Sequence, residues 1–379
     1  MKTIYSILFL LLFLLSCSQQ TQNNKEKVRT YNISLENIST SNFFTNVDTA
    51  YFVVLETNNN SLIGEIGQLS ISNKLILTDR QTNSIMQFDL KGNHISTNTK
   101  VGNGPGEYIR IDGLCIYEPK DYIMILDAMK NKVIVYDSNF NFIEERNTSV
   151  PFGPTAFSIF DYNTLVFEQS INSTQSDKKY NLFVNNKNGE TTYLLPFNKT
   201  ANTVFSPRIT LYYTNDTLVY VPTYNNIVYN IFNNKIEPRL KFDFGDKWIK
   251  EDIVYNSSLG ENPLKFIETL KDQDFVYFFN ELENSTHIYI DFYYKNDSYI
   301  SIINKKDNKN TLIRLNKNND FSIKPLSIYK DYFIIPVTTS ESTKIINNNY
   351  KFKGKNKMFE LNNKLQEENN PILMFVKFK

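Results

Sequence analysis

The sequence predicts an all-β fold, namely a six-bladed β-propeller of four-stranded antiparallel blades with small helical insertions. Three observations support this prediction. The 379 residues include 29 Phe, 24 Tyr and 51 Asn, a composition typical of many short strands joined by turns. Two stretches of the chain repeat one pattern with an offset of 48 residues. Each repeat contains four short apolar runs, and four-strand units with a period of 40–50 residues are typical of propellers.

The chain begins with a segment typical of an exported protein. Lys2 precedes an apolar run at residues 4–15, which is shorter than the roughly 20 residues that span a membrane. The sequence Leu14-Leu15-Ser16-Cys17 resembles a bacterial lipobox, in which the cysteine is lipidated. We therefore predict a signal peptide at residues 1–16 and lipidation of Cys17. The alternative is an ordinary signal peptide followed by an incidental cysteine.

Residues 17–45 are predicted to carry the lipid and to form a flexible tether to the propeller, residues 46–379. Residues 18–27 (SQQTQNNKEK) contain no apolar side chain, which is typical of a tether. Removal of residues 1–16 leaves 40 basic and 40 acidic residues. This balance argues against a nucleic-acid partner and indicates that the lipid, not a basic patch, holds the protein at the membrane. We expect an outer-membrane lipoprotein on the periplasmic or cell-surface face.

The repeat is clearest in the first two units. The first contains KLILTD at residues 74–79 and IMQFD at 85–89, and the second contains YIMILD at 122–127 and VIVYD at 133–137. Shorter apolar pieces precede and follow these runs, at residues 69–71, 93–95, 114–116 and 141–143. Each unit is therefore predicted to supply four strands. Cys115 lies in one of these apolar pieces, so we expect a buried structural thiol.

Weaker copies predict the remaining blades. The third unit contains strands at residues 156–159, 164–168 and 181–184, and the fourth at 218–221 and 227–231. The fifth contains strands at 275–279, 287–292 and 299–303, and the sixth at 321–323, 332–337 and 372–378. We expect the strand near residues 51–55 to close the ring beside 372–378, because closure leaves few exposed edges. An array of open β-sandwiches is the alternative.

Two helical insertions are predicted from apolar residues at helical spacing. The first follows Asn262-Pro263 and uses Leu264, Ile267 and Leu270. The second uses Met358, Leu361 and Leu365 and ends before Asn370-Pro371.

A glycine-rich loop, Gly102-Asn103-Gly104-Pro105-Gly106-Glu107-Tyr108, separates the first two units. A phosphate-binding loop is disfavoured because no Gly-Lys-Ser/Thr follows and no helix is predicted there. A tight structural turn is favoured, in which Gly102, Gly104 and Gly106 permit positive φ and Pro105 fixes the entry. Glu107 is expected either to bind a ligand or to accept hydrogen bonds from the amides of this loop.

This loop, followed by blades ending in Leu-Asp and Val-Tyr-Asp, resembles the six-bladed β-propeller lipoproteins of Gram-negative bacteria, which are related to NHL-repeat propellers. Residues 226–229, 238 and 241–245 resemble the middle segment of that family, and residues 368–377 resemble its C-terminus. The resemblance covers residues 46–379. It implies an exported, anchored propeller without an assigned activity.

Propeller connectivity places certain loops together on one face of the ring. Turns between the second and third strands share this face with the connections between blades, near the mouth of the channel, where ligands of propellers usually bind. We therefore predict a binding face there, although Asp79 and Asp127 are also suited to capping turns. Its residues are Asp79, Arg80, Asn83, Glu107, Tyr108, Arg110, Asp127 and Lys130.

No catalytic constellation is evident. His94 and His287 are the only two histidines, so a multi-histidine metal site is excluded, and both are expected at the surface. No cofactor is predicted, although carboxylates and carbonyls in the channel leave calcium open. The aromatic residues Tyr212, Tyr213, Trp248, Tyr293 and Tyr294 are expected to pack between blades or to contact a partner.

The sequence therefore indicates an exported, lipid-anchored module that binds a ligand, a glycan or an envelope protein, without intrinsic catalysis. The alternatives are a metal-dependent propeller enzyme, lyase-like or lactonase-like, and a structural envelope component.

Overall fold

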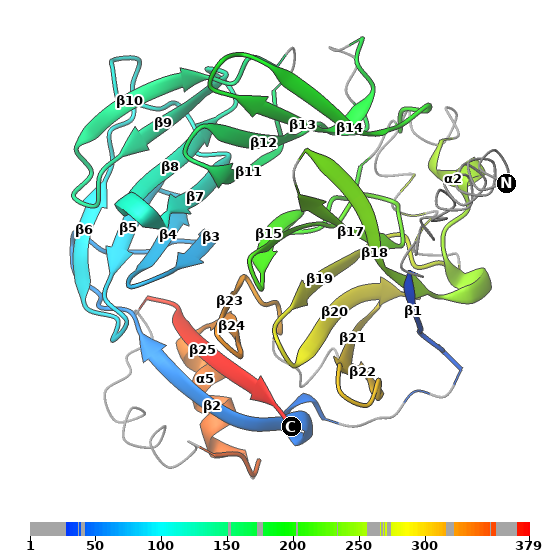
Figure 1. Ribbon diagram of the computed structural model, residues 1–379. Coiled ribbons are helices and arrows are strands. Elements are labelled where there is room, and N and C mark those ends of the chain that lie inside the picture. Colours follow the sequence, from blue (N-terminus) through cyan, green and yellow to red (C-terminus); the bar gives the residue numbers. More distant parts are fainter. Residues whose placement is uncertain are drawn as a thin grey trace, which may run out of the picture.

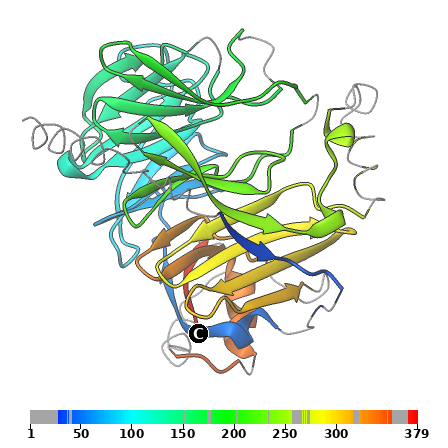
Figure 2. The same cartoon turned by 45° about the vertical axis from the view of Figure 1, so that its right-hand side comes forward.

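The computed structural model describes residues 28–36, 38, 42–150, 153–172, 177–201, 204–232, 234–255, 266, 268, 270, 274–315, 322–348, 350–353 and 370–379. Six β-sheets are arranged side by side in a closed ring (Figures 1 and 2). The predicted six-bladed propeller is thus confirmed.

Four of the six blades are built from consecutive strands, which pair antiparallel with their neighbours in sequence order. Blade A contains β3 (Ile66–Ile71), β4 (Leu75–Asp79), β5 (Ser84–Phe88) and β6 (His94–Asn98). Blade B contains β7 (Gly113–Tyr117), β8 (Tyr122–Asp127), β9 (Lys132–Tyr136) and β10 (Phe142–Asn147). Blade C contains β11 (Ala156–Asp161), β12 (Thr164–Glu168), β13 (Tyr180–Asn186) and β14 (Thr191–Pro196). Blade E contains β19 (Phe279–Glu283), β20 (His287–Tyr294), β21 (Asp297–Asn304) and β22 (Asn310–Arg314).

Blade F closes the ring with strands from both ends of the chain. It contains β23 (Ser327–Tyr329), β24 (Tyr332–Val337), β25 (Ile372–Phe378) and the N-terminal β2 (Val47–Val54) as its outermost strand. The β2 and β25 strands pair antiparallel, with Phe52 opposite Met374. The predicted closing contact is therefore confirmed. The inner strand of this blade, β23, lies a few residues beyond the predicted segment 321–323.

Blade D carries a fifth strand that the sequence analysis missed. It contains β15 (Leu211–Thr214), β16 (Thr217–Tyr220), β17 (Ile227–Phe232) and β18 (Lys235–Asp243), and β1 (Arg29–Asn32) pairs parallel to β18 at its outer edge. The predicted tether, residues 17–45, is thus too long. The physical reason is the apolar side chains of Tyr31 and Ile33, which are buried against blade D and blade E.

The hydrophobic core consists of layers between neighbouring blades. One cluster joins blades A and B through residues such as Ile85 and Ile125, and another joins blades C and D through Val166 and Leu218. Each of the other four junctions also has a cluster of its own. A four-stranded sheet exposes two apolar faces, so each blade requires a neighbour on both sides. This requirement explains the ring.

Helical segments are short and lie outside the blades. They are η1 (Phe43–Asn46), η2 (Glu118–Lys120), η3 (Gly245–Lys247), α2 (Glu251–Val254) and α5 (Thr339–Asn347). The α5 helix begins with a capping box between Thr338 and Glu341 and buries Ile345 and Ile346. The predicted helix after Pro263 lies mostly outside the described residues, but Phe266, Glu268 and Leu270 are helical. The predicted helix at Met358, Leu361 and Leu365 lies wholly outside them. Within the part of the chain that the structure describes, no helix has the length and apolar character needed to cross a membrane.

Candidate functional site

The central channel of the ring contains a cavity with a volume of about 1530 Å³. Residues of the innermost strand of every blade line it, namely β3, β7, β11, β15, β19 and β23. We call this space the central cavity. The loop face is the face that carries the turns between the second and third strands and the connections between blades. The opposite face carries the turns between first and second strands, where a further cavity of about 680 Å³ opens beside residues such as Asn73, Asn215 and Asp331.

Asp79 and Asp127 end the second strands of blades A and B on the loop face. The Asp79 carboxylate accepts hydrogen bonds from the backbone N–H of Glu65 at 2.8 Å and from the Thr82 hydroxyl at 2.6 Å. The Asp127 carboxylate accepts one from the backbone N–H of Ile109 at 2.6 Å. Burial alone would raise the pKa of Asp79, but its hydrogen bonds outweigh burial and lower the pKa. Both buried carboxylates therefore fix a turn and an inter-blade connection.

The four predicted basic and amide residues of this face also contact their own loops. Arg80 and Arg110 are exposed, and their guanidinium groups form ion pairs with Glu65 at 3.0 Å and Asp112 at 2.6 Å. The Asn83 amide donates a hydrogen bond to the Ile109 carbonyl at 2.8 Å. The Lys130 ammonium donates a hydrogen bond to the Glu107 carbonyl at 2.9 Å. Asn83 and Lys130 thus join the turns of blades A and B to the connection between them, whereas the Arg80 and Arg110 ion pairs are local.

Glu107 folds back over the glycine-rich loop, and its carboxylate accepts a hydrogen bond from the Gly104 N–H at 2.8 Å. A Cβ atom at Gly102 would lie only 2.1 Å from the Glu107 Oε2 atom, so a larger residue there would displace the Glu107 carboxylate. Gly106 has a φ of +71°, and a Cβ atom at that position would lie 2.7 Å from the Phe142 ring. Pro105 lies in the turn just before Gly106. The loop is therefore a compact structural turn around the Glu107 side chain.

Tyr108 is fully buried between blades A and B. Its hydroxyl lies 3.0 Å from the Asn83 carbonyl oxygen and 2.9 Å from the Asn98 carbonyl oxygen. Burial raises the pKa of Tyr108, so the hydroxyl stays protonated and donates to these carbonyls. Tyr108 therefore contributes to packing at the blade junction.

A pattern that the sequence analysis did not recognise extends this arrangement around the ring. Blades A, B, C and E each have a buried carboxylate where the second strand reaches the loop face, at Asp79, Asp127, Glu168 and Asp291. Their surroundings differ. Backbone N–H groups contact the first two, whereas Asp291 forms an ion pair with Arg208 and accepts a hydrogen bond from Asn280 at 2.8 Å.

Glu168 of blade C is the exception among the four, because its recorded partners are neutral hydroxyl groups. Its Oε2 atom accepts hydrogen bonds from Thr210 at 2.8 Å and Thr155 at 3.1 Å, and its Oε1 atom accepts one from Tyr220 at 3.1 Å. The residue is 4% exposed and lies in the wall of the central cavity. Burial raises the pKa of Glu168 to about 7, and the three hydroxyl groups only partly oppose that shift.

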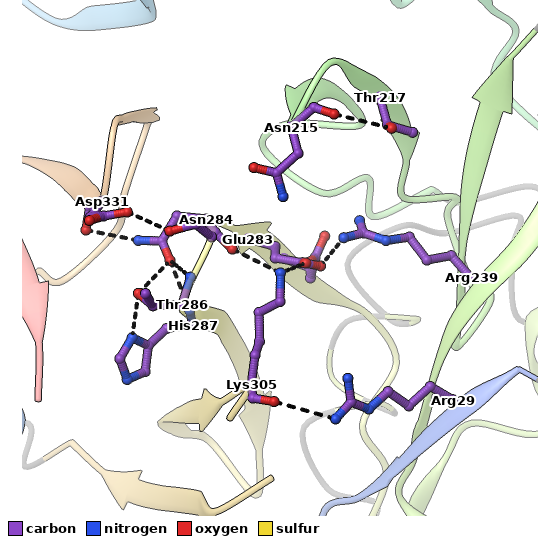
Figure 3. A network of polar contacts seen from close by, with 12 residues as sticks. Arg29, Asn215, Thr217, Arg239, Glu283, Asn284, Thr286, His287, Lys305 and Asp331 are labelled. Atoms are coloured by element: carbon purple, nitrogen blue, oxygen red, sulfur yellow. Dashed lines mark hydrogen bonds and ion pairs between the residues drawn. The ribbon is translucent and has the colours of Figure 1, made fainter. Parts of the chain in front are cut away.

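A second buried polar network joins blades D and E (Figure 3). Glu283 of β19 forms ion pairs with Arg239 of β18 and with Lys305. The Lys305 ammonium also donates to the Asn284 carbonyl at 3.1 Å. Glu281, two residues earlier on β19, accepts a hydrogen bond from Tyr212 at 2.7 Å, and burial together with the charge of Glu283 raises its pKa. These residues pack between the blades, so we regard the network as a structural link.

The two histidines and the free cysteine lie in three different blades. His94 contacts Thr97 at 2.8 Å, whereas His287 is buried and contacts the Lys379 carbonyl at 2.9 Å, contrary to the expected surface position. Cys115 is half-buried in the wall of the central cavity, and its thiol lies 3.4 Å from the Phe157 carbonyl. Among the described residues, no group of three or more His, Cys, Asp or Glu side chains is arranged to hold a metal ion.

Sequence reasoning missed Glu168, Arg208 and Asp291 for identifiable reasons. Glu168 and Asp291 end or nearly end a second strand, as Asp79 does, so aligning weaker blades on that carboxylate would have found them. Arg208 precedes β15 in a stretch without any repeat signal. Its pairing with blade E becomes evident only when the ring is closed.

Comparison with solved structures places this fold among known propellers. A Bacteroides fragilis NCTC 9343 protein named for its expected export (BF0058) aligns with a TM-score of 0.79 and 20% identity, covering 92% of this chain and 99% of that chain. A DUF4221 family member from Bacteroides vulgatus ATCC 8482 aligns with a TM-score of 0.54 and 12% identity, covering 88% and 97%. These similarities concern the fold. No curated protein matches the sequence. The profile of the family described as "Domain of unknown function (DUF4934)" matches residues 27–377, and the chain therefore belongs to the DUF4934 family.

Proposed function

We propose that this protein is an exported, lipid-anchored binding module of the cell envelope, and that its ligand or partner enters the central cavity from the loop face. The observation that carries the proposal is the cavity itself. Its volume of about 1530 Å³ exceeds the 300–1,000 Å³ of typical small-molecule pockets. Rigid inner strands form its walls, which suits a preformed site.

The distribution of polar groups supports the loop face as the entrance. Glu168, Arg208 and Thr210 line the cavity at that end. Arg80 and Lys324 also line it, and neither side chain is buried. Arg80 is one of the predicted binding-face residues, whereas Glu107 and Lys130 contact each other beside the connection between blades A and B.

Export and anchoring rest on the N-terminal sequence. The apolar run and the Leu14-Leu15-Ser16-Cys17 sequence support them, as does the fold shared with a protein named for expected export. A Cys17→Ala variant should lose incorporation of labelled fatty acid and leave the membrane fraction, whereas Ser18→Ala should behave as the wild type. Unchanged labelling of Cys17→Ala would contradict the anchor.

The binding role is tested by thermal unfolding of the full-length protein in detergent with a panel of oligosaccharides, with calcium, and with calcium plus a chelator. A ligand at 100 times its dissociation constant should stabilise the protein by about 2.7 kcal/mol. An oligosaccharide response supports the proposal, and a calcium response lost in chelator favours the enzyme alternative.

Location in the cavity is tested with a blocking variant. Ser70→Trp places an indole on β3 in the cavity wall and should weaken binding at least about tenfold, or by 1.4 kcal/mol. Asn188→Trp, on the exposed turn of blade C, is the matched control and should bind as the wild type does. Equal binding by both variants would place the ligand outside the cavity.

A further inference from the structure

Glu168 stands out among the buried carboxylates of the loop face because it lacks a charged partner among the described residues. Asp291 contacts the Arg208 guanidinium, and Asp79 receives hydrogen bonds from backbone N–H groups. Glu168 receives three hydrogen bonds, all from uncharged hydroxyl groups. A buried carboxylate without an opposite charge is costly, and such a group is normally protonated or paired with a cation.

Among the described residues, the elements that pack against Glu168 supply no cation to its carboxylate. Thr155 precedes β11, Thr210 precedes β15, and Tyr220 ends β16. Asn181 of β13, another uncharged residue, lies near the same Tyr220 hydroxyl. Arg208 lies two residues before Thr210, but its guanidinium points to blade E, where it forms two contacts with Asp291. No positive charge from the described part of the chain therefore contacts the Glu168 carboxylate.

The missing charge faces a space that a ligand can occupy. Glu168, Thr155 and Thr210 all line the central cavity, and the neighbouring wall contains the apolar residues Ala156 and Ile209. Charges attract more strongly beside such a wall than in bulk water. From the described residues the Oε1 atom of Glu168 accepts one hydrogen bond, so it has capacity for another donor.

From these observations we propose that Glu168 anchors a ligand in the central cavity through an ammonium group of that ligand. This inference rests on the proposed binding function and names its ligand class. An ammonium group supplies the positive charge that Glu168 does not receive from any described residue, together with a donor for its Oε1 atom. Quaternary ammonium compounds supply the charge alone.

The proposal predicts a particular pH dependence. Because burial raises the pKa of Glu168 to about 7, the carboxylate is mostly protonated at pH 6 and mostly ionised at pH 8. Affinity for an ammonium compound should therefore increase about tenfold between these pH values, since only the ionised fraction binds. Binding at pH 7 should release about half a proton per ligand. Calorimetry in buffers of different ionisation enthalpy measures this release.

The test uses calorimetric titration of the full-length protein in detergent at pH 8. The probes are choline, spermidine and butylammonium, with 3,3-dimethylbutan-1-ol and butan-1-ol as uncharged counterparts. We expect at least one cation to bind and its uncharged counterpart not to bind. Glu168→Gln should weaken binding at least about tenfold. Glu190→Gln, on an exposed turn of the same blade, is the matched control and should change nothing.

A second variant separates lost binding from lost structure. Thr210→Val removes one donor to the ionised carboxylate, so it should raise the pKa of Glu168 and move the midpoint of the pH dependence upward by about one unit. Absence of binding by every cation at millimolar concentration would overturn the proposal, as would equal binding by wild type and Glu168→Gln. An oligosaccharide response that Ser70→Trp abolishes, without any ammonium response, would overturn only this inference and leave the proposed function intact.

Discussion

The substitution Glu168→Gln should change the way in which stability depends on pH, independently of any ligand. In the folded protein, burial raises the pKa of this carboxyl group from 4.5 to about 7. In the unfolded chain the pKa returns to its ordinary value. Between these two values the folded state binds a proton that the unfolded state does not. The wild type therefore loses stability as pH rises from about 5 to about 8.

The size of the effect follows from the shift. About 2.5 pKa units correspond to about 3 kcal/mol, since one unit corresponds to 1.36 kcal/mol. A glutamine side chain does not titrate, and its amide group suits the hydrogen-bond partners of this site. Its carbonyl oxygen can replace Oε2, which accepts from Thr155 and Thr210, while its NH₂ group can donate to the Tyr220 hydroxyl. Relative to the wild type, the variant should therefore gain about 3 kcal/mol in unfolding free energy between pH 5 and pH 8.

Urea denaturation of both proteins at intervals across this pH range measures the difference. Other groups, including Glu281 and His287, titrate in both proteins, so their contributions cancel. Glu190→Gln serves as the control and should follow the wild type at every pH. A difference between Glu168→Gln and wild type that does not vary with pH would refute the burial argument for Glu168.

Three further substitutions test the loops and the closure of the ring by denaturant unfolding. Gly106→Ala should destabilise the protein by more than about 1 kcal/mol, because it combines a positive φ with a clash against Phe142. The control, Gly189→Ala, has a positive φ but open space around the new Cβ atom, so it should destabilise the protein less. Equal losses of stability would contradict the clash. Asn370→Ala should lower the free energy of unfolding by about 2–3 kcal/mol. The buried Asn370 amide contacts the Glu56 and Ser61 carbonyls and the Ile63 N–H across the closing junction. An unchanged denaturation midpoint would show that the closure does not depend on this amide. Tyr108→Phe should lower the free energy of unfolding by about 1 kcal/mol, because the hydroxyl contacts are lost. Tyr193→Phe, at an exposed tyrosine, is the control. A loss of stability no larger than that of the control would contradict the contribution of the Tyr108 hydroxyl.

Much of the fold can be predicted from local sequence, because each blade is built from the same pattern of short apolar runs and turns. The runs that end at Asp79 and Asp127 match β4 and β8, since a short continuous apolar run followed by a turn-capping Asp specifies a buried strand and its end. The closing pair was also predictable, because a ring leaves β25 without a partner unless an N-terminal strand supplies one. The capping sequence at Thr338–Glu341 would have indicated α5, although only one turn of apolar residues follows it.

The remaining features depend on contacts between distant segments. Tyr31 and Ile33 are the local sign that this segment is more than a tether, but the sheet edge that β1 joins becomes evident only beside β18. Likewise, Glu168 becomes unusual only when Thr210 and Tyr220 of the next blade are brought against it. A sequence shows that a carboxylate is present, but whether it has an opposite charge nearby is a property of the closed ring.

The position of β1 has a mechanical consequence for the whole molecule. The four residues of β1 pair parallel to β18 on blade D, whereas the strand that closes the ring, β2, follows later in the chain and joins blade F (Figure 1). A pulling force applied to the N-terminus therefore loads the β1–β18 hydrogen bonds first, and it does so along the strand direction, in shear. The β2–β25 pair bears no tension until β1 detaches and the intervening segment is drawn straight. Tension at the N-terminus is thus borne by the β1–β18 pair of blade D before it reaches the β2–β25 pair that closes the propeller.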